Sequence, residues 1–112
     1  MFEIRNYHYD PTKFDAYRQW AEDEAVPFLK ANLDIIGFWI DNGLAAEYRG
    51  TDPMELKHGA ANITWIIRWA SKEDRDEGHK RVFGGDGWQD IWSRHPDANG
   101  YLQMEAKFAE AL

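Results

Sequence analysis

The four histidines of this chain are the side chains best suited to proton transfer and metal binding near neutral pH. They are His8, His58, His79 and His95, and no two of them have the i, i+4 spacing of a metal-binding helix. A site of two histidines and one carboxylate, built from His8, His79 and Glu24, would have to be assembled by the fold. We therefore predict no metal site and no other cofactor.

The local surroundings of the histidines predict different roles for them. His58 and His95 adjoin Gly59 and Pro96 in expected loops, so we predict that solvent surrounds both rings. His79 lies on the apolar side of an expected helix and is predicted to be a core residue with a hydrogen-bond partner. His8 lies on an expected central strand, which makes it the best histidine candidate for catalysis.

Alternation along the first strand places Arg5, Tyr7 and Tyr9 on one face. In a structural interpretation, which we favour, Arg5 pairs with a carboxylate such as Glu3 and the two rings fill the core. In a functional interpretation, the guanidinium and the phenol point into a cleft and hold a polar ligand. The same two interpretations apply to Arg68, because a buried charge needs a partner in the protein or in a ligand. The candidate ligand-binding residues are Arg5, Tyr7, Tyr9, Arg68 and His79.

Other chemical motifs are missing from the sequence. There is no cysteine, and no serine-centred, phosphate-loop or dinucleotide motif. The glycine-rich run 84–87 follows an expected helix and not a strand, so it predicts a helix stop and not a phosphate cradle.

Hydrophobic periodicity predicts the elements that position these residues. Strands are expected at 2–9, 35–40, 62–70 and 101–108, and helices at 13–32, 71–83 and 86–94. Pro27 should kink the first helix or start a new segment, Ser71 should cap the second, and Gly37 indicates a bulge or a close backbone approach. The connection 41–60 includes Pro53, and its part 44–48 would extend a strand or form a flap.

Two strand–helix–strand halves predict one α+β domain over residues 1–112 with the ferredoxin-like βαββαβ arrangement. Its four-stranded antiparallel sheet would carry helices on one face only. The other face would be apolar and bare, which predicts a homodimer. The aromatic content, 17 of 112 residues with six tryptophans, fits a large interface or a pocket with flat walls.

Charge and hydropathy limit the partners. The net charge is -7, with 20 acidic and 13 basic residues, so phosphate backbones would be repelled and no nucleic-acid partner is expected. No apolar run approaches the roughly 18 residues of a membrane span, and the first residues do not form a signal peptide. We therefore expect a cytoplasmic protein with no membrane partner.

Short motifs in this order and spacing resemble the NIPSNAP family. In the first half they are Phe2 to Tyr7, Pro11, Ala25 to Leu29 and Ile36 to Trp39. In the second half they are Trp69, Ser71, Glu73, Arg75 and Gly87 to Gln89. The resemblance spans about residues 2–108 and departs from the family in the longer connection 41–60. It implies a ferredoxin-like fold that pairs as a dimeric α/β barrel, in a family where many members have no established activity.

Three functions follow as hypotheses. The favoured one is a NIPSNAP-like homodimer that binds a small hydrophobic or aromatic ligand in an aromatic-lined pocket between helices and sheet. An alternative, by analogy with related barrels, is a cofactor-independent monooxygenase acting on an aromatic or quinol substrate, with Asn6, His8, Asn62 and Trp65 as candidate catalytic residues. A second alternative is a structural or protein-interaction dimer without a ligand.

Overall fold

The computed structural model describes residues 1–52 and 56–112. Its strands are β1 (Phe2–Tyr9), β2 (Ile35–Ile40), β3 (Ile63–Arg68) and β4 (Tyr101–Ala109). Its α-helices are α1 (Phe14–Trp20), α2 (Val26–Asn32), α3 (Lys72–Phe83) and α4 (Asp86–Trp92). Short 3-10 turns lie at Pro11–Lys13 and Ala98–Gly100, and a π-helical stretch at Ala21–Ala25 joins α1 to α2.

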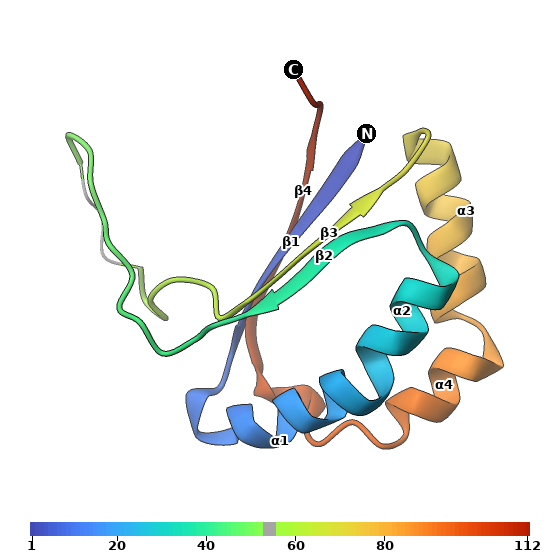
Figure 1. Cartoon of the computed structure of the whole chain (residues 1–112), viewed down its shortest axis with the longest axis horizontal. Coiled ribbons are helices and arrows are strands. Elements are labelled where there is room, and N and C mark those ends of the chain that lie inside the picture. Colours follow the sequence, from blue (N-terminus) through green and yellow to red (C-terminus); the bar gives the residue numbers. More distant parts are fainter. Residues whose placement is uncertain (53–55) are drawn as a thin grey trace.

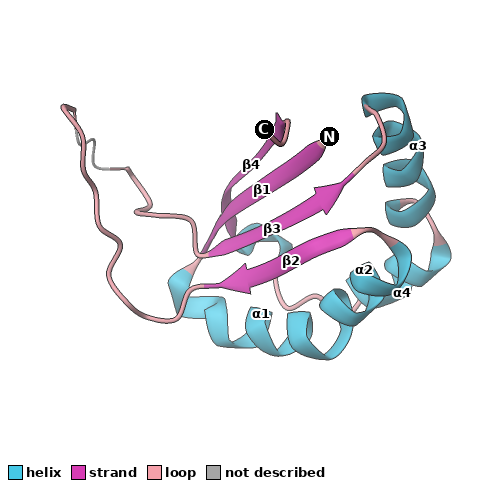
Figure 2. Cartoon of the chain, turned by 45° about the horizontal axis from the view of Figure 1, so that its top comes forward, coloured by secondary structure: helices cyan, strands magenta, loops and turns pink. Residues whose placement is uncertain are grey.

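The four strands form one antiparallel sheet in the order β2-β3-β1-β4. This order, with a helical crossover after β1 and another after β3, is the ferredoxin-like arrangement that the sequence predicts. Figures 1 and 2 show all four α-helices on the same face of the sheet. We call this the helix face, and the opposite one the open face.

The expected helix 13–32 is interrupted, and the interruption lies just before Pro27. The π-helical stretch Ala21–Ala25 separates α1 from α2, and Pro27 then occupies the first turn of α2, where its missing N–H costs least. Ser71 caps α3 as predicted, because its hydroxyl accepts a hydrogen bond from the Asp74 N–H at 3.1 Å. Within the described residues, no helix is both long and apolar enough to span a membrane.

The strand β2 contains the predicted irregularity at Gly37. The register with β3 shifts between Ile35 and Gly37, and a Cβ at Gly37 would come within 2.3 Å of the Trp39 ring. The strand ends at Ile40, so the predicted extension over 44–48 is wrong: these residues are exposed and belong to no strand. Figure 1 shows the described residues of the connection after β2 projecting away from the sheet. Pro53 lies outside the described residues.

Strand alternation divides the side chains between the two faces. On β1, Glu3, Tyr7 and Tyr9 are buried under the helices, as predicted. On β3, Ile63 and Ile67 are fully buried on that same face. The two tyrosines and the two isoleucines pack with the buried sides of α1 and α2 into the core.

Candidate functional site

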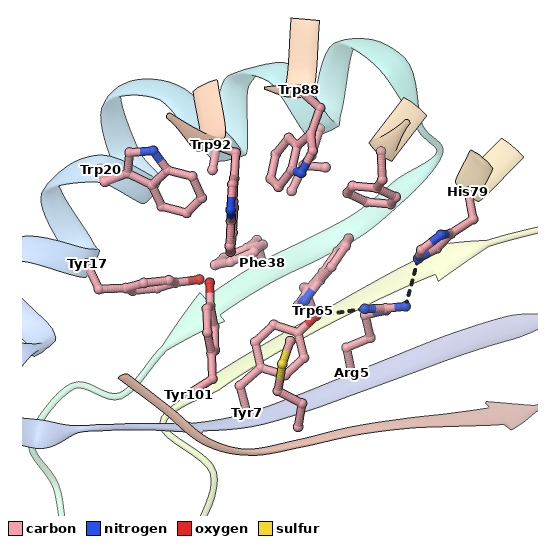
Figure 3. A pocket seen from close by; sticks show the side chains of 14 residues that line it. Arg5, Tyr7, Tyr17, Trp20, Phe38, Trp65, His79, Trp88, Trp92 and Tyr101 are labelled. Atoms are coloured by element: carbon pink, nitrogen blue, oxygen red, sulfur yellow. Dashed lines mark hydrogen bonds between the residues drawn. The ribbon is translucent and has the colours of Figure 1, made fainter. Parts of the chain in front are cut away.

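A cavity of about 230 Å³ lies between the helices and the sheet. Its walls are aromatic: Trp65 from β3, Phe38 from β2, Trp20 from α1, and Trp88 and Trp92 from α4 (Figure 3). The remaining lining residues are Arg5, Tyr7, Tyr17, Ala25, Leu29, His79, Phe83, Tyr101 and Met104. The cavity is therefore built from both halves of the sequence.

The volume of the cavity limits its contents. Pockets for drug-sized ligands span roughly 300–1,000 Å³, so a large ligand does not fit. An apolar cavity of about 150 Å³ is enough to hold benzene. At about 230 Å³, this cavity has room for one aromatic ring with a small substituent.

One end of the cavity carries charged and polar side chains, and we call it the polar end. The carboxylate of Glu3 holds two arginines in place there. This carboxylate is fully buried and accepts hydrogen bonds from Arg5 Nε at 2.7 Å, from Arg75 Nε and Nη2 at 2.9 and 3.1 Å, and from Trp69 Nε1 at 3.0 Å. Burial alone would raise the pKa of this carboxyl. The hydrogen bonds and charges of Arg75 and Arg5 outweigh burial and lower the pKa of Glu3 to about 2. Glu3 is therefore ionised and fixes both guanidinium groups.

Arg5 connects this anchor to the cavity. Its Nη1 donates to the Tyr7 hydroxyl at 2.8 Å, and its Nη2 donates to His79 Nε2 at 3.3 Å. Its guanidinium carbon lies 5.3 Å from the centre of a Trp65 ring, close enough for a cation–π contact. The dashed lines in Figure 3 follow these bonds across the cavity floor.

His79 is a neutral acceptor at this end of the cavity. Burial and the positive charges of Arg5 and Arg75 lower the pKa of His79 below its ordinary value. Because Arg5 donates to Nε2, the proton of the neutral ring resides on Nδ1. The prediction that His79 has a hydrogen-bond partner is confirmed, but the ring is half-buried and lines the cavity instead of belonging to the core.

The indole nitrogen of Trp65 is buried without a hydrogen-bond partner among the described residues. The Trp65 side chain is only 3% exposed. Tyr7 packs edge-on to this ring at 6.4 Å, and Figure 3 shows the indole nitrogen on the edge that faces Tyr7. A buried N–H without a partner is costly, but almost none of the Nε1 surface is accessible to a water-sized probe. An acceptor in the cavity therefore reaches this N–H only after the Trp65 or Tyr7 ring shifts.

Two tyrosines form the opposite end of the cavity. Figure 3 shows the hydroxyls of Tyr17 and Tyr101 pointing toward each other. Behind them, His95 Nδ1 accepts from the Asp97 N–H at 3.1 Å, and His95 Nε2 lies 2.8 Å from the Tyr101 hydroxyl. Since Nδ1 accepts, Nε2 carries the proton and donates to Tyr101.

The prediction that solvent surrounds His95 is wrong. Its ring packs between Trp20 and Trp92, with ring centres 4.4 and 4.3 Å away. Burial among these rings lowers the pKa of His95 to about 4. His58 is half-buried, with its ring centre 6.2 Å from that of His8.

Of the residues proposed from the sequence to bind a ligand, three line the cavity: Arg5, Tyr7 and His79. Tyr9 lies outside it, because its ring is buried against Gly100 and its hydroxyl donates to the Asp97 carbonyl at 2.8 Å. Arg68 is exposed and pairs with Asp34 at 2.8 Å.

The four residues proposed for oxygenase chemistry are not brought together. Trp65 lines the cavity, but Asn6 and His8 alternate to the open face. Asn6 accepts a hydrogen bond from the Thr64 hydroxyl at 2.8 Å, and His8 Nε2 lies 3.0 Å from the Gly59 carbonyl oxygen. The Asn62 amide holds the backbone of β1, accepting from the Tyr9 N–H at 2.9 Å and donating to its carbonyl at 2.8 Å. Within residues 1–52 and 56–112, no cluster of three His, Asp or Glu side chains is arranged to hold a metal.

Several cavity residues did not emerge as site candidates from the sequence. They are Tyr17, Trp20, Trp88, Trp92 and Tyr101. Trp88 and Trp92 have i, i+4 spacing, which places both rings on one face of α4. That spacing predicts a shared packing surface but does not reveal the cavity beneath it.

The fold and the cavity together define a ferredoxin-like α+β protein with a partly open, aromatic-lined cavity under its helices. Comparison of the sequence with protein-family models finds no match, and comparison with curated proteins finds none either. Comparison of the structure does find solved proteins with a similar fold.

The chain is similar in structure to NIPSNAP proteins of bacteria. An uncharacterised NIPSNAP domain protein from Burkholderia xenovorans superposes with a TM-score of 0.71 at 15% identity, covering 99% of this chain and 93% of the other. A NIPSNAP family protein from Agrobacterium tumefaciens gives a TM-score of 0.69 at 18% identity, covering 95% and 80%. The fold implied by the sequence resemblance is thus the fold of solved NIPSNAP proteins. At these low sequence identities, the comparison shows a shared fold and nothing about function.

Proposed function

We propose that this protein belongs to the NIPSNAP family and binds a small single-ring aromatic molecule in the cavity between its helices and its sheet. The observation that carries the proposal is the unpartnered indole N–H of Trp65 in the wall of an aromatic cavity of about 230 Å³. A ring stacked among the tryptophans would bury apolar surface, and an oxygen on that ring would accept from Trp65.

The purely structural alternative is less well supported by the same cavity. A core that served only to hold two subunits together would be packed to crystal-like density with its polar atoms satisfied. Here a cavity large enough for an aromatic ring persists next to an unsatisfied donor. Ligand binding accounts for both features.

The oxygenase alternative also receives less support than binding. Its proposed base, His8, and its proposed amide donors, Asn6 and Asn62, do not line the cavity that Trp65 lines. A reaction that needs all four side chains on one substrate would require a different arrangement of β1.

We further propose that a second copy of the chain covers the open face. Ile66 and Ile4 lie at its centre, and Trp39 is 50% exposed at its β2 side. At its other side, Glu105 and Lys107 lie on β4 opposite Asn6 and Ile4. A two-fold axis through the face would bury its apolar centre and let carboxylates meet ammonium groups at the rim.

Filling the cavity tests the binding function. Ala25 lines the cavity and is 2% exposed, so Ala25→Leu places three additional carbons in the space for the ligand. Quenching of tryptophan fluorescence would be measured during titration with benzoate, benzamide and toluene. We expect the unmodified protein to bind members of this set and Ala25→Leu to lose at least tenfold in affinity for them.

The matched control is Ala16→Leu, the same change at an exposed position of α1. It should bind the probes as the unmodified protein does. If none of the three probes binds the unmodified protein at millimolar concentration, or if Ala25→Leu binds them undiminished, the proposed function is wrong.

A further inference from the structure

We infer that the ligand of this cavity is an anion, an aromatic carboxylate whose oxygens lie against Arg5, Tyr7 and Trp65. This inference rests on the proposed function and narrows it from any small aromatic molecule to a charged class. It follows from the charges, the free donors and the acceptors that face the cavity.

The charges at the polar end do not balance. Arg5, Arg75 and Lys72 form one connected network with the carboxylates of Glu3 and Asp76. Three cations thus share two anions, and the adjacent His79 is neutral because burial and the two arginines lower its pKa. One additional negative charge at Arg5 would make the network neutral.

Arg5 is also the charged residue that reaches the cavity. No Asp, Glu or Lys stands beside it among the described residues that line the cavity. Its side chain is 13% exposed, so an ion pair formed with it is shielded from water and stronger than a surface pair. A cationic ligand would be repelled here, and a neutral one would leave the excess charge uncompensated.

Hydrogen-bond donors converge at the same end. Arg5 has five N–H groups, of which three have partners within the described chain: Glu3, Tyr7 and His79. The Tyr7 hydroxyl accepts from Arg5, so its own proton is free to donate. The indole N–H of Trp65 is a further unpartnered donor among the described residues, and it becomes available when the Trp65 or Tyr7 ring shifts on binding. A carboxylate, with about four acceptor positions, matches two N–H groups of Arg5, one hydroxyl and one indole.

The test compares two probes of equal shape and different charge. Benzoate and its neutral isostere benzamide would be titrated into the unmodified protein, Arg5→Gln and Trp65→Phe, with calorimetry giving each Kd. Because hydrogen bonds to charged groups are strong, we expect benzoate to bind the unmodified protein roughly tenfold to a hundredfold more tightly than benzamide. The ratio should fall close to one in Arg5→Gln and should fall severalfold in Trp65→Phe.

Two features of the chain make the comparison interpretable. Arg5→Gln leaves Glu3 bonded to Arg75 and Trp69, so the buried carboxylate keeps partners and the fold should persist. Arg68→Gln is the matched control, because Arg68 is exposed and pairs with Asp34 away from the cavity. It should preserve the ratio of the unmodified protein. If Arg5→Gln does not fold, Trp65→Phe alone decides the question.

The outcomes separate the two proposals. Binding of both probes with a ratio near one would overturn the anion inference and leave aromatic binding intact. Binding of toluene without binding of benzoate would also overturn the anion inference and leave aromatic binding intact. If no probe binds, the proposed function itself fails and the inference fails with it. A ratio above ten that Trp65→Phe leaves unchanged would show that Trp65 takes no part in holding the carboxylate.

Discussion

The two faces of β1 carry alternate residues of one eight-residue strand and differ sharply in chemistry. On the helix face, Glu3, Arg5 and Tyr7 form a connected chain of charged and polar groups that ends in a cavity. On the open face, the Asn6 side chain bonds to its cross-strand neighbour Thr64, and His8 reaches the Gly59 carbonyl. Polar residues occur on both faces, so polarity alone does not identify the functional face.

The two faces of β1 differ in the elements that pack against them. The helix face meets α3 and α4, which bring Arg75, His79 and three large rings from distant parts of the sequence to β1. No helix of the described residues lies over the open face (Figure 2), so no helix brings distant side chains to Asn6 and His8. We therefore propose ligand binding for the helix face and assembly for the open face.

The largest effect should come from removing the buried charge of the helix face. Glu3→Gln leaves Arg5 and Arg75 without their shared carboxylate. Breaking a buried ion pair typically costs about 3–5 kcal/mol, so we expect a loss near 3 kcal/mol in the free energy of unfolding, measured by urea denaturation. Glu22→Gln is the control: its exposed pair with Arg18 should contribute less than about 1 kcal/mol. Equal effects of the two changes would contradict the anchoring role of Glu3.

A charge in the centre of the open face should break assembly and spare the cavity. We expect Ile66→Glu to weaken dimerisation by about a hundredfold or more, because an unpaired carboxylate would be buried between subunits. Light scattering coupled to gel filtration would give the mass. Leu44→Glu, in the exposed connection, should stay dimeric. An unmodified protein that is monomeric at micromolar concentration would rule out this role for the open face.

The tyrosine end of the cavity should make stability depend on pH. The pKa of His95 is about 4 in the folded protein and near 6.5 in an unfolded chain. Between these values the unfolded chain binds more protons, so the free energy of unfolding should fall as pH drops from about 6.5 to about 4. Glu3, with a pKa of about 2, adds its own loss only below about pH 4.5.

Replacing His95 isolates this contribution. Melting temperatures of His95→Gln should decline less steeply over the same pH range. A residual slope is expected, since the pKa of His79 is lowered too. Identical slopes for the two proteins would show that the His95 ring is not held neutral by burial.

The smallest effect should come from the polar contact of the open face. Thr64→Val removes the hydroxyl that donates to Asn6 while keeping the side-chain shape. A single neutral hydrogen bond contributes about 1 kcal/mol, so urea denaturation should show a loss of that size or less. The affinity for benzoate should not change. A loss of affinity would mean that the two faces are coupled.

Much of the fold was predictable because strong local signals agree with the global arrangement. Alternation in β1, the Ser71 cap and the Gly37 irregularity each appear where the pattern places them. The interruption before Pro27 was predicted in kind, although its π-helical form was not. The connection after Ile40 gave no reliable signal, since the apolar residues described there, such as Leu44 and Leu56, are exposed.

The site was predictable only in part. Alternation grouped Arg5 with Tyr7 correctly, because both lie on one strand. It could not show that His79 would meet Arg5, 74 residues away, or that His95 would pack between two tryptophans. Such contacts depend on how α3 and α4 dock on the sheet, which local periodicity does not encode.

The most direct test of the central claim is the response of the tryptophan indole N–H signals in an NMR titration with benzoate. Six tryptophans give separate signals, and Trp65→Phe and Trp39→Phe assign the two that matter. We predict that the Trp65 signal moves to lower field as its N–H gains an acceptor, while that of Trp39 on the open face stays in place. A Trp39 signal that moves while Trp65 remains unchanged would contradict the account.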